Sequence, residues 1–377
     1  GQTRVTMDLE AALALDAPPS DDPEKLLNRF NLAIENLTLS GDLFNQLPPN
    51  LRQIYKDFKP QGPIGLTFKL ERRDRWWSQR CIVHPDGIEA EFVDFPYRLA
   101  SIHGKLEQVT TSDGKDELTV SLTGASGGRP IVIEGTIRGS GAQTHMNLKI
   151  HGRGLTLDDN LRHALGNNRN VLDSFRPIGT GDFVARLKQE PGDLHTDIHM
   201  QIDFIRLAVC HEEFPHPLEN IRGTLQMRFG KETRVNFEQF VGTHNGGEVA
   251  LDGNYLVTPS GNVLRAKLRA SALPFDADLN GAFARVNLQS LWKAARPSGR
   301  LSFTGDVDHT NLNAPQGAAK PPSRLVVNCH QFTADSVLPE FLPYELTGVT
   351  GAFHYANDRV TLTSFSAHHR TSRLSLG

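Results

Sequence analysis

The densest group of potential metal ligands in the sequence is HEEFPH, residues 211–216, with two histidines and two glutamates. Imidazole nitrogens and carboxylate oxygens are donors that zinc accepts, so this group could hold such an ion. The spacing of His211 and His216 matches no known zinc pattern. Two segments of related sequence carry Asp94 or Glu340 at this place and no histidine. We therefore expect no metal and no other cofactor.

A second candidate is ERRDRWW, residues 71–77, where arginine stands next to tryptophan. Such pairs can bind phosphate head groups or nucleic acid. The two acidic residues weaken the positive charge, and charge runs are usually solvated, so we interpret the run as a hairpin tip. The chain has 40 basic and 43 acidic residues and no second run of this kind, so we expect no nucleic-acid partner.

Catalytic signatures are absent from the sequence. It has no G-x-S-x-G, P-loop or dinucleotide-binding fingerprint, and its carboxylates are spread along the chain, so we expect no enzyme. Cys81, Cys210 and Cys329 form neither a disulfide framework nor a zinc pattern. No apolar run reaches the roughly 20 residues that span a bilayer, and the start does not resemble a signal peptide. We interpret the chain as an excerpt of a longer protein whose anchoring segments lie outside it.

Three similar segments organise the chain: FKPQGPIG from residue 58, FRPIGTGDF from residue 175 and ARPSG from residue 295. Their prolines, Pro60, Pro177 and Pro297, are 117 and 120 residues apart. Further landmarks follow each in the same order: FPYRLASIHGKL, FPHPLENIRGTL and LPYELTGVTGAF, then PIVIEGTI, GEVALDGNY and SRLSLG. We predict three tandem repeats of about 118 residues, at 31–145, 146–263 and 264–377, after a tail of a preceding repeat and a linker at 1–30.

Apolar residues recur at every second position after each of these segments, which is typical of strands with one apolar face. We predict about seven strands in each repeat, separated by turns such as PDG (85–87) and SDGKD (112–116). The three segments share the pattern xPxG, in which x is any residue. A short amphipathic helix should precede each xPxG segment and cover the apolar face. The predicted fold class is mainly β: an elongated, tandem-repeat antiparallel sheet that curls into a gutter, with one short helix per repeat. A barrel and a sandwich are the other ways to cover such a face.

The segment FPHPLENIRGTLQMRFGKETRVNFEQFVGTHNGGEVALDGNY, residues 214–255, resembles the AsmA-like proteins of the bacterial envelope, the group that includes AsmA and TamB. Looser copies begin at Phe95 and Leu342, and the resemblance covers residues 31–377. It implies the long curled sheet called a β-taco, similar to that of bridge-like lipid transfer proteins. It also implies a place in the periplasm, with anchoring to the inner membrane in the full-length protein.

A gutter with an apolar floor can hold acyl chains, so we expect a segment that binds and conducts phospholipids between the inner and outer membranes. The alternative is a structural or adhesive β-repeat scaffold with a packed interior and no ligand. The alternation along the strands selects these residues as the groove lining: Leu66, Phe68, Leu70, Leu118, Val120, Ile131, Ile133, Phe183, Leu187, Val235, Phe237, Val249, Leu251, Leu301, Phe303, Phe353, Val360 and Leu362.

Overall fold

A computed structural model describes most of the chain. The described residues are 2–11, 27–38, 52, 55–56, 58–73, 76–93, 95–110, 116–139, 141–164, 173, 175–193, 195–212, 214–229, 232–313, 321–356 and 359–376. The predicted turn at 112–116 and the predicted loop at 313–323 lie largely outside them, as does most of the helix expected after Pro49. Of that helix, Arg52, Tyr55, Lys56 and Phe58 are described and helical.

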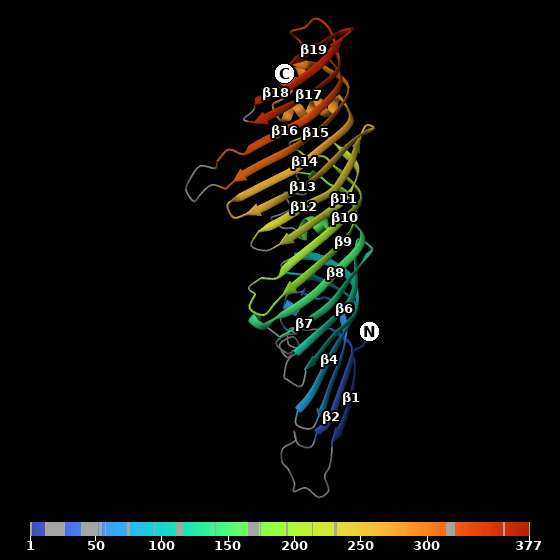
Figure 1. Ribbon diagram of the computed structural model, residues 1–377. Helices are drawn as coiled ribbons and strands as arrows, with labels where there is room; N and C mark the ends of the chain where they lie inside the picture. The colour runs from blue at the N-terminus through green and yellow to red at the C-terminus, as the bar shows by residue number, and fades with distance from the viewer. Residues whose placement is uncertain are drawn as a thin grey trace. The chain divides into compact units, whose positions relative to one another are not determined.

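The protein is mainly β, and its 19 described strands belong to an open antiparallel sheet that does not close into a barrel (Figure 1). This confirms the predicted fold class. Contacts divide the chain into a first unit, residues 1–166 and 184–198, and a second unit, residues 167–183 and 199–377. We describe each unit by itself.

In the first unit, each strand pairs with the next one along the chain. A 3-10 turn, Gly141–Gln143, precedes the eighth strand, and helix α4, Asp159–Ala164, follows it. The strands are β1 (Arg4–Ala11), β2 (Leu27–Thr38), β3 (Pro63–Arg73), β4 (Trp76–Phe92), β5 (Phe95–Thr110), β6 (Asp116–Ser126), β7 (Arg129–Arg138) and β8 (His145–Thr156).

The ninth strand, β9 (Ile178–Gln189), has residues in both units. In the second unit, the strands from β11 onward again pair consecutively. Two helices, α6 (Ala277–Arg285) and α7 (Gln289–Ala295), stand between β14 and β15. The strands are β10 (Asp197–Val209), β11 (Leu218–Phe229), β12 (Thr233–His244), β13 (Gly247–Thr258), β14 (Gly261–Pro274), β15 (Pro297–Leu312), β16 (Arg324–Val337), β17 (Leu346–Ala356), β18 (Arg359–His369) and β19 (Ser372–Leu376).

One order of elements occurs three times along the chain: a strand, a helical segment, and five more strands. The first strands are β2, β8 and β14, and the helical segments contain residues 52, 55, 56 and 58, then α4, and then α6 with α7. Each set therefore has six described strands, where the sequence predicted about seven. The third helical segment holds two helices, where the sequence predicted one.

The predicted turn at PDG (85–87) is wrong, and this accounts for the miscounted strand. These residues lie inside β4, where Pro85 pairs with Ile64 and Asp86 pairs with His103. Gly87 has a φ of 70°, and the register shifts between Asp86 and Ile88. The glycine therefore forms an irregularity within a continuous strand, because a bulge absorbs an extra residue without reversing the chain.

The xPxG segments mark the place where each helical segment ends. The residue before each proline is basic and left-handed: φ is 41° at Lys59, 44° at Arg176 and 41° at Arg296. The Arg296 amide donates to the Trp292 carbonyl at 2.8 Å, and the Lys59 amide donates to Tyr55 at 2.9 Å. A left-handed residue that closes such a bond ends a helix, and the following proline cannot continue it.

Bulges recur at matching places in the three sets. Asn36, Gly154 and Ala272, near the ends of the first strands, have φ values of 54°, 62° and 52°. Ser101, Asn220 and Gly348 have φ values of 50°, 53° and 56°. Each of this second group precedes a side chain that is at most 5% exposed: Ile102, Ile221 and Val349. An extra left-handed residue bends the strand, and here it turns the following apolar side chain inward.

Replacement of Ala272 by glycine should stabilise the protein by up to about 1 kcal/mol, because a left-handed conformation costs an L-residue about 1–2 kcal/mol. Gly154 already occupies the matching place in the middle set. Urea unfolding measures the change.

The matched control is Ala270→Gly, two residues earlier on the same strand. Ala270 is buried and has no positive φ, so this change should destabilise the protein by about 1 kcal/mol. Equal losses in the two variants would contradict the role assigned to Ala272.

Candidate functional site

The strand registers of the first unit gather apolar side chains on one face. Directly opposed residues in an antiparallel pair point to the same side of the sheet. One such row crosses seven strands: Ile34, Leu66, Val83, Leu106, Val120, Gly135 and Leu148. The predicted residues Phe68, Leu70, Leu118, Ile131 and Ile133 lie in neighbouring rows of the same face.

The second unit repeats this arrangement. One row comprises Phe240, Leu251, Leu268, Gly305, Cys329, Phe353 and Leu362. The next comprises Gly242, Val249, Ala270, Phe303, Phe332, Gly351 and Phe365. Val235, Phe237, Leu301 and Val360 lie on this face as well. We use the term apolar face for the face that carries these rows in each unit.

The two predicted residues of β9 are placed less directly. Leu187 packs against the buried cluster of Leu118, Val120 and Leu148, so it shares the apolar face of the first unit. Phe183 is half-buried and stands four residues before Leu187, at a position of the same alternation. Sequence reasoning did not assign Cys81 and Cys329, which also lie on the apolar faces; burial raises the pKa of both thiols.

Much of the apolar face is only partly covered. Among the described residues, the largest side chains buried almost completely are Ile131, Leu346 and Val349, so every larger aromatic side chain keeps some exposure. Exposure is high at Met7 (62%) and Leu362 (51%). Met7 lies opposite Leu32, and Leu362 lies opposite Phe353, so both belong to the apolar faces. These faces therefore present hydrocarbon to the surroundings over several strands.

Small packed clusters cover parts of each face. In the second unit, Ala334, Leu346, Val349 and Ala367 form such a cluster, and Phe275, next to helix α6, packs against it. The Trp292 ring of α7 contacts Phe275, with ring centroids 5.7 Å apart. In the first unit, Ile64, Ile88 and Ile102 form a comparable cluster. Phe275 thus links the Trp292 ring of α7 to the cluster of the second unit.

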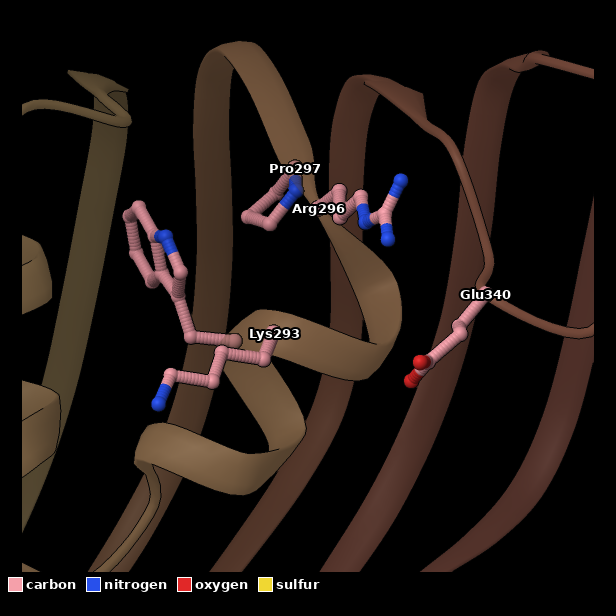
Figure 2. A pocket seen from close by; sticks show the side chains of 5 residues that line it. Lys293, Arg296, Pro297 and Glu340 are labelled. Carbon is pink, nitrogen blue, oxygen red and sulfur yellow. The ribbon is translucent and has the colours of Figure 1, made fainter.

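A hollow of about 520 Å³ lies beside the C-terminus of α7 (Figure 2). Its lining combines Trp292 and Pro297 with the charged side chains Lys293, Arg296 and Glu340. Burying unpaired charges against hydrocarbon is costly, so this hollow does not suit an acyl chain. It is not an extension of the apolar face.

The opposite face of the first unit is polar. Cross-strand ion pairs join Arg138 to Glu117 at 2.7 Å and Lys149 to Glu134 at 3.0 Å. Glu107 pairs with both Lys105 and Arg80. Hydrogen bonds from Lys105 and Arg80 hold the pKa of the Glu107 carboxyl below its usual range, although burial opposes the shift. The two faces therefore differ sharply in chemistry.

The structure places residues of the two segments, HEEFPH and ERRDRWW, that the sequence singled out as possible binding sites. In HEEFPH, Glu213 lies outside the described residues, and the ring of His211 contacts Phe175. His216 instead approaches His244 and Asp276, a grouping that sequence reasoning missed. In ERRDRWW, Arg73 pairs with Trp76 across the junction of β3 and β4, and positions 74 and 75 lie outside the described residues.

Comparison with protein-family models, with curated proteins and with solved structures finds no match. Within the described ranges, no helix is long and apolar enough to cross a membrane. The assignment of function therefore depends on the two faces themselves.

Replacement of Glu107 by glutamine should lower the free energy of unfolding at pH 7 by about 1 kcal/mol, since the partly exposed partners limit the loss. A carboxyl with a lowered pKa stabilises the fold above its unfolded pKa of about 4.3 and loses that contribution as the pH falls. Thermal unfolding at pH 7 and at about pH 3 measures the difference, which should shrink in acid.

Glu134→Gln serves as the control, because Glu134 pairs with Lys149 but is half exposed. Its effect should be the smaller of the two. A difference between wild type and Glu107→Gln that grows in acid would contradict the assigned ion pairs.

Proposed function

We propose that the apolar faces bind phospholipid acyl chains and that the chain is a segment of an envelope protein that conducts phospholipids between the inner and outer membranes. The observation that carries the proposal is the partly covered apolar face, opposed by a polar face that keeps such a sheet in water.

The energetics favour hydrocarbon as the ligand. Burying one CH₂ group contributes about 0.8 kcal/mol, so a 16-carbon chain gains on the order of 10 kcal/mol before the cost of ordering. Rows of similar side chains repeat from strand to strand, so no single position forms a deep binding well. A bound chain can then shift along the face in small steps.

The head group should remain at the margin of the face. The free-energy cost of burying an unpaired charge exceeds the gain from contact with hydrocarbon, so phosphate stays in water or near basic side chains. The apolar faces consist mostly of Leu, Ile, Val, Phe and small residues, with few polar side chains such as Gln108 among them. They favour acyl chains over polar ligands but do not distinguish one head group from another. Recognition by chain rather than by head group follows from this composition.

The resemblance to AsmA-like proteins supports the place of action. It favours the periplasm, with an inner-membrane anchor supplied by segments outside this chain. The second candidate, a structural scaffold, is favoured by the packed clusters of buried apolar side chains in each unit. The two candidates differ in whether the exposed apolar side chains meet lipid.

A pair of cysteines on one strand can separate these candidates. In a Cys210→Ser background, Leu362→Cys places a thiol on the apolar face, and Thr361→Cys places one on the polar face, opposite His354. Palmitoyl-oleoyl phosphatidylglycerol vesicles should slow alkylation of the first thiol several-fold and leave the second unchanged. Peptide mass spectrometry separates both thiols from Cys81 and Cys329, which are buried.

Organic extraction of the purified protein provides the second readout, and phospholipid should be present in the extract. Equal alkylation rates with and without vesicles, together with an extract free of lipid, would overturn the proposal and leave the scaffold.

A further inference from the structure

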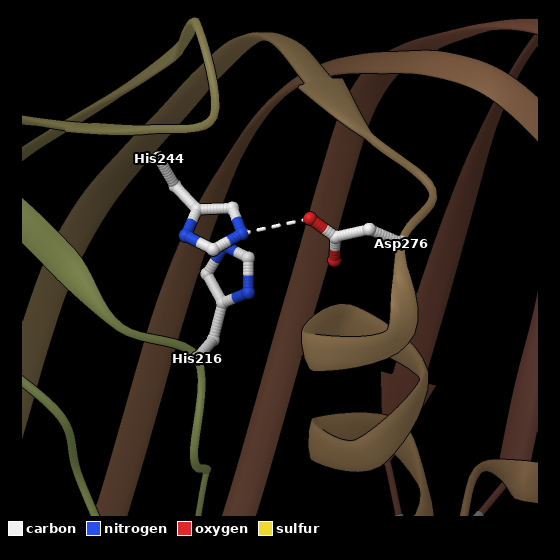
Figure 3. A group of neighbouring side chains, drawn as sticks. All are labelled: His216, His244 and Asp276. Atoms are coloured by element: carbon white, nitrogen blue, oxygen red, sulfur yellow. Dashed lines mark hydrogen bonds and ion pairs between the residues drawn. The ribbon is translucent and has the colours of Figure 1, made fainter.

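Three potential metal ligands meet beside the N-terminus of helix α6, far from one another in sequence. His216 precedes β11, His244 ends β12, and Asp276 caps α6. One ligand atom of each lies within 4.8 Å of the others. Figure 3 shows the two rings close together, with the Asp276 carboxylate directed toward them. All three residues belong to the second unit.

Both histidines are buried, at 7% exposure for His216 and 6% for His244. Neither ring nitrogen of His216 has a hydrogen-bond partner. A buried polar group without a partner costs about 1–3 kcal/mol, so such groups are rare unless an ion or another ligand pairs with them. Burial and the neighbouring His244 ring lower the pKa of His216.

Both ring nitrogens of His244 face hydrogen-bond acceptors. Its Nδ1 lies 2.8 Å from the carbonyl oxygen of Pro217, and its Nε2 lies 2.8 Å from Asp276 Oδ2. Both oxygens can only accept, so a protonated ring donates to both, and a neutral ring donates to one and turns a lone pair toward the other. The Asn245 amide nitrogen also lies 3.1 Å from Nε2. In the neutral ring with Nδ1–H donating to Pro217, the Nε2 lone pair and Asp276 Oδ2 are placed to share a metal cation.

Asp276 is held in place by other bonds. Its Oδ1 accepts from the Leu279 amide at 3.0 Å, as an N-cap does, and its Oδ2 accepts from Asn245 at 2.9 Å. Burial opposes ionisation, but these bonds and that of His244 outweigh it and lower the pKa of the carboxyl to about 2. The carboxylate is therefore charged and directed at the rings.

The first unit shows the same three positions without the two histidines. Tyr97 stands where the FPxxL pattern has His216, Ser126 ends β6 as His244 ends β12, and Asp158 caps α4 as Asp276 caps α6. Tyr97 hydrogen bonds to Ser126. In the middle copy, two histidines thus replace a tyrosine and a serine that hydrogen bond to each other.

The third copy is intermediate. Tyr344 contacts His369, with ring centroids 4.4 Å apart, and His369 Nδ1 lies 2.9 Å from the carbonyl oxygen of Glu345. This repeats the contact of His244 with Pro217. Of these three copies, the middle one carries two histidines and an aspartate together.

We propose that His216, His244 and Asp276 form a binding site for a divalent transition-metal ion of the zinc class. Two imidazoles and one carboxylate are ligands that zinc takes, with a water or a further side chain in the fourth position. The Asp278 carboxylate, 3.7 Å from His244 Nε2, offers a further ligand oxygen. Ligand atoms around tetrahedral zinc lie roughly 3.3 Å apart, so small side-chain rotations close the present spacing.

The surrounding bonds match those of metal sites. A ligating histidine usually donates its other N–H to a carbonyl or carboxylate, as His244 does to Pro217. A bound ion would join the approach to β11, the β12–β13 turn and the start of α6. The site would thereby fix the start of α6 against these strands.

The test is titration of the metal-free full chain with Zn²⁺ by calorimetry, and with Co²⁺ by visible absorption. The wild type should bind one equivalent in a saturable manner, with a Co²⁺ spectrum typical of nitrogen and oxygen ligands, and Zn²⁺ should raise its Tm. The double variant His216→Tyr/His244→Ser installs the side chains of the first copy, and its affinity should fall by more than about 100-fold. Asp276→Asn retains a good N-cap and should also weaken binding.

His330→Gln is the control for adventitious binding, because His330 forms an exposed pair with Asp306. This variant should bind Zn²⁺ like the wild type, and circular dichroism should show that every variant is folded. Equal zinc affinity in the wild type and the folded double variant, or no saturable binding by the wild type, would overturn the proposal.

Discussion

The structure depends on one geometric constraint: side chains alternate along each strand, and antiparallel partners place opposed residues on the same side. Apolar residues at every second position therefore become a continuous face only while every register is kept. A slip of one residue would move the apolar set of a strand into water. The ion pairs of the polar face act on the same registers, because Arg138 meets Glu117 and Lys149 meets Glu134 only in the observed pairing.

Glycine maintains these registers at places where backbones approach closely. A Cβ at Gly135 would lie 2.1 Å from the Asn147 carbonyl oxygen, and one at Gly253 would lie 2.4 Å from that of Arg265. These glycines are among the landmarks by which the repeat is visible in the sequence. The repeat therefore preserves backbone requirements as well as the apolar pattern.

The alternation of apolar and polar residues was enough to predict the β class. It also selected residues that the registers place on the apolar face of their unit, such as Phe68 in the first and Phe303 in the second. The repeat boundaries at 31, 146 and 264 stay predictions. Local turn signals were less reliable. The segment around Gly87 predicts a turn, but the long pairing of β4 with β3 and β5 keeps this glycine within a strand. The alternation also left Cys81 and Cys329 unassigned, because cysteine counted as chemistry and not as part of an apolar row.

Sequence spacing could not predict the grouping of His216 with His244 and Asp276, because the three residues come from separate elements. Only an alignment of the copies, with Tyr97, Ser126 and Asp158 beside them, would have indicated it. The neighbouring candidate HEEFPH attracted attention because its residues are close in sequence. Closeness in sequence is a poor guide in a sheet whose neighbours are set by pairing.

The left-handed residue and proline that end each helical segment separate that segment from the hydrogen-bond ladder that follows. The next strand begins at most three residues from that proline whether one helix or two precede it: at Pro63, Ile178 and Pro297. The helical segment accordingly differs between the copies, while the strands that follow it still pair consecutively. Protein engineers could therefore replace this helical segment within an otherwise regular sheet.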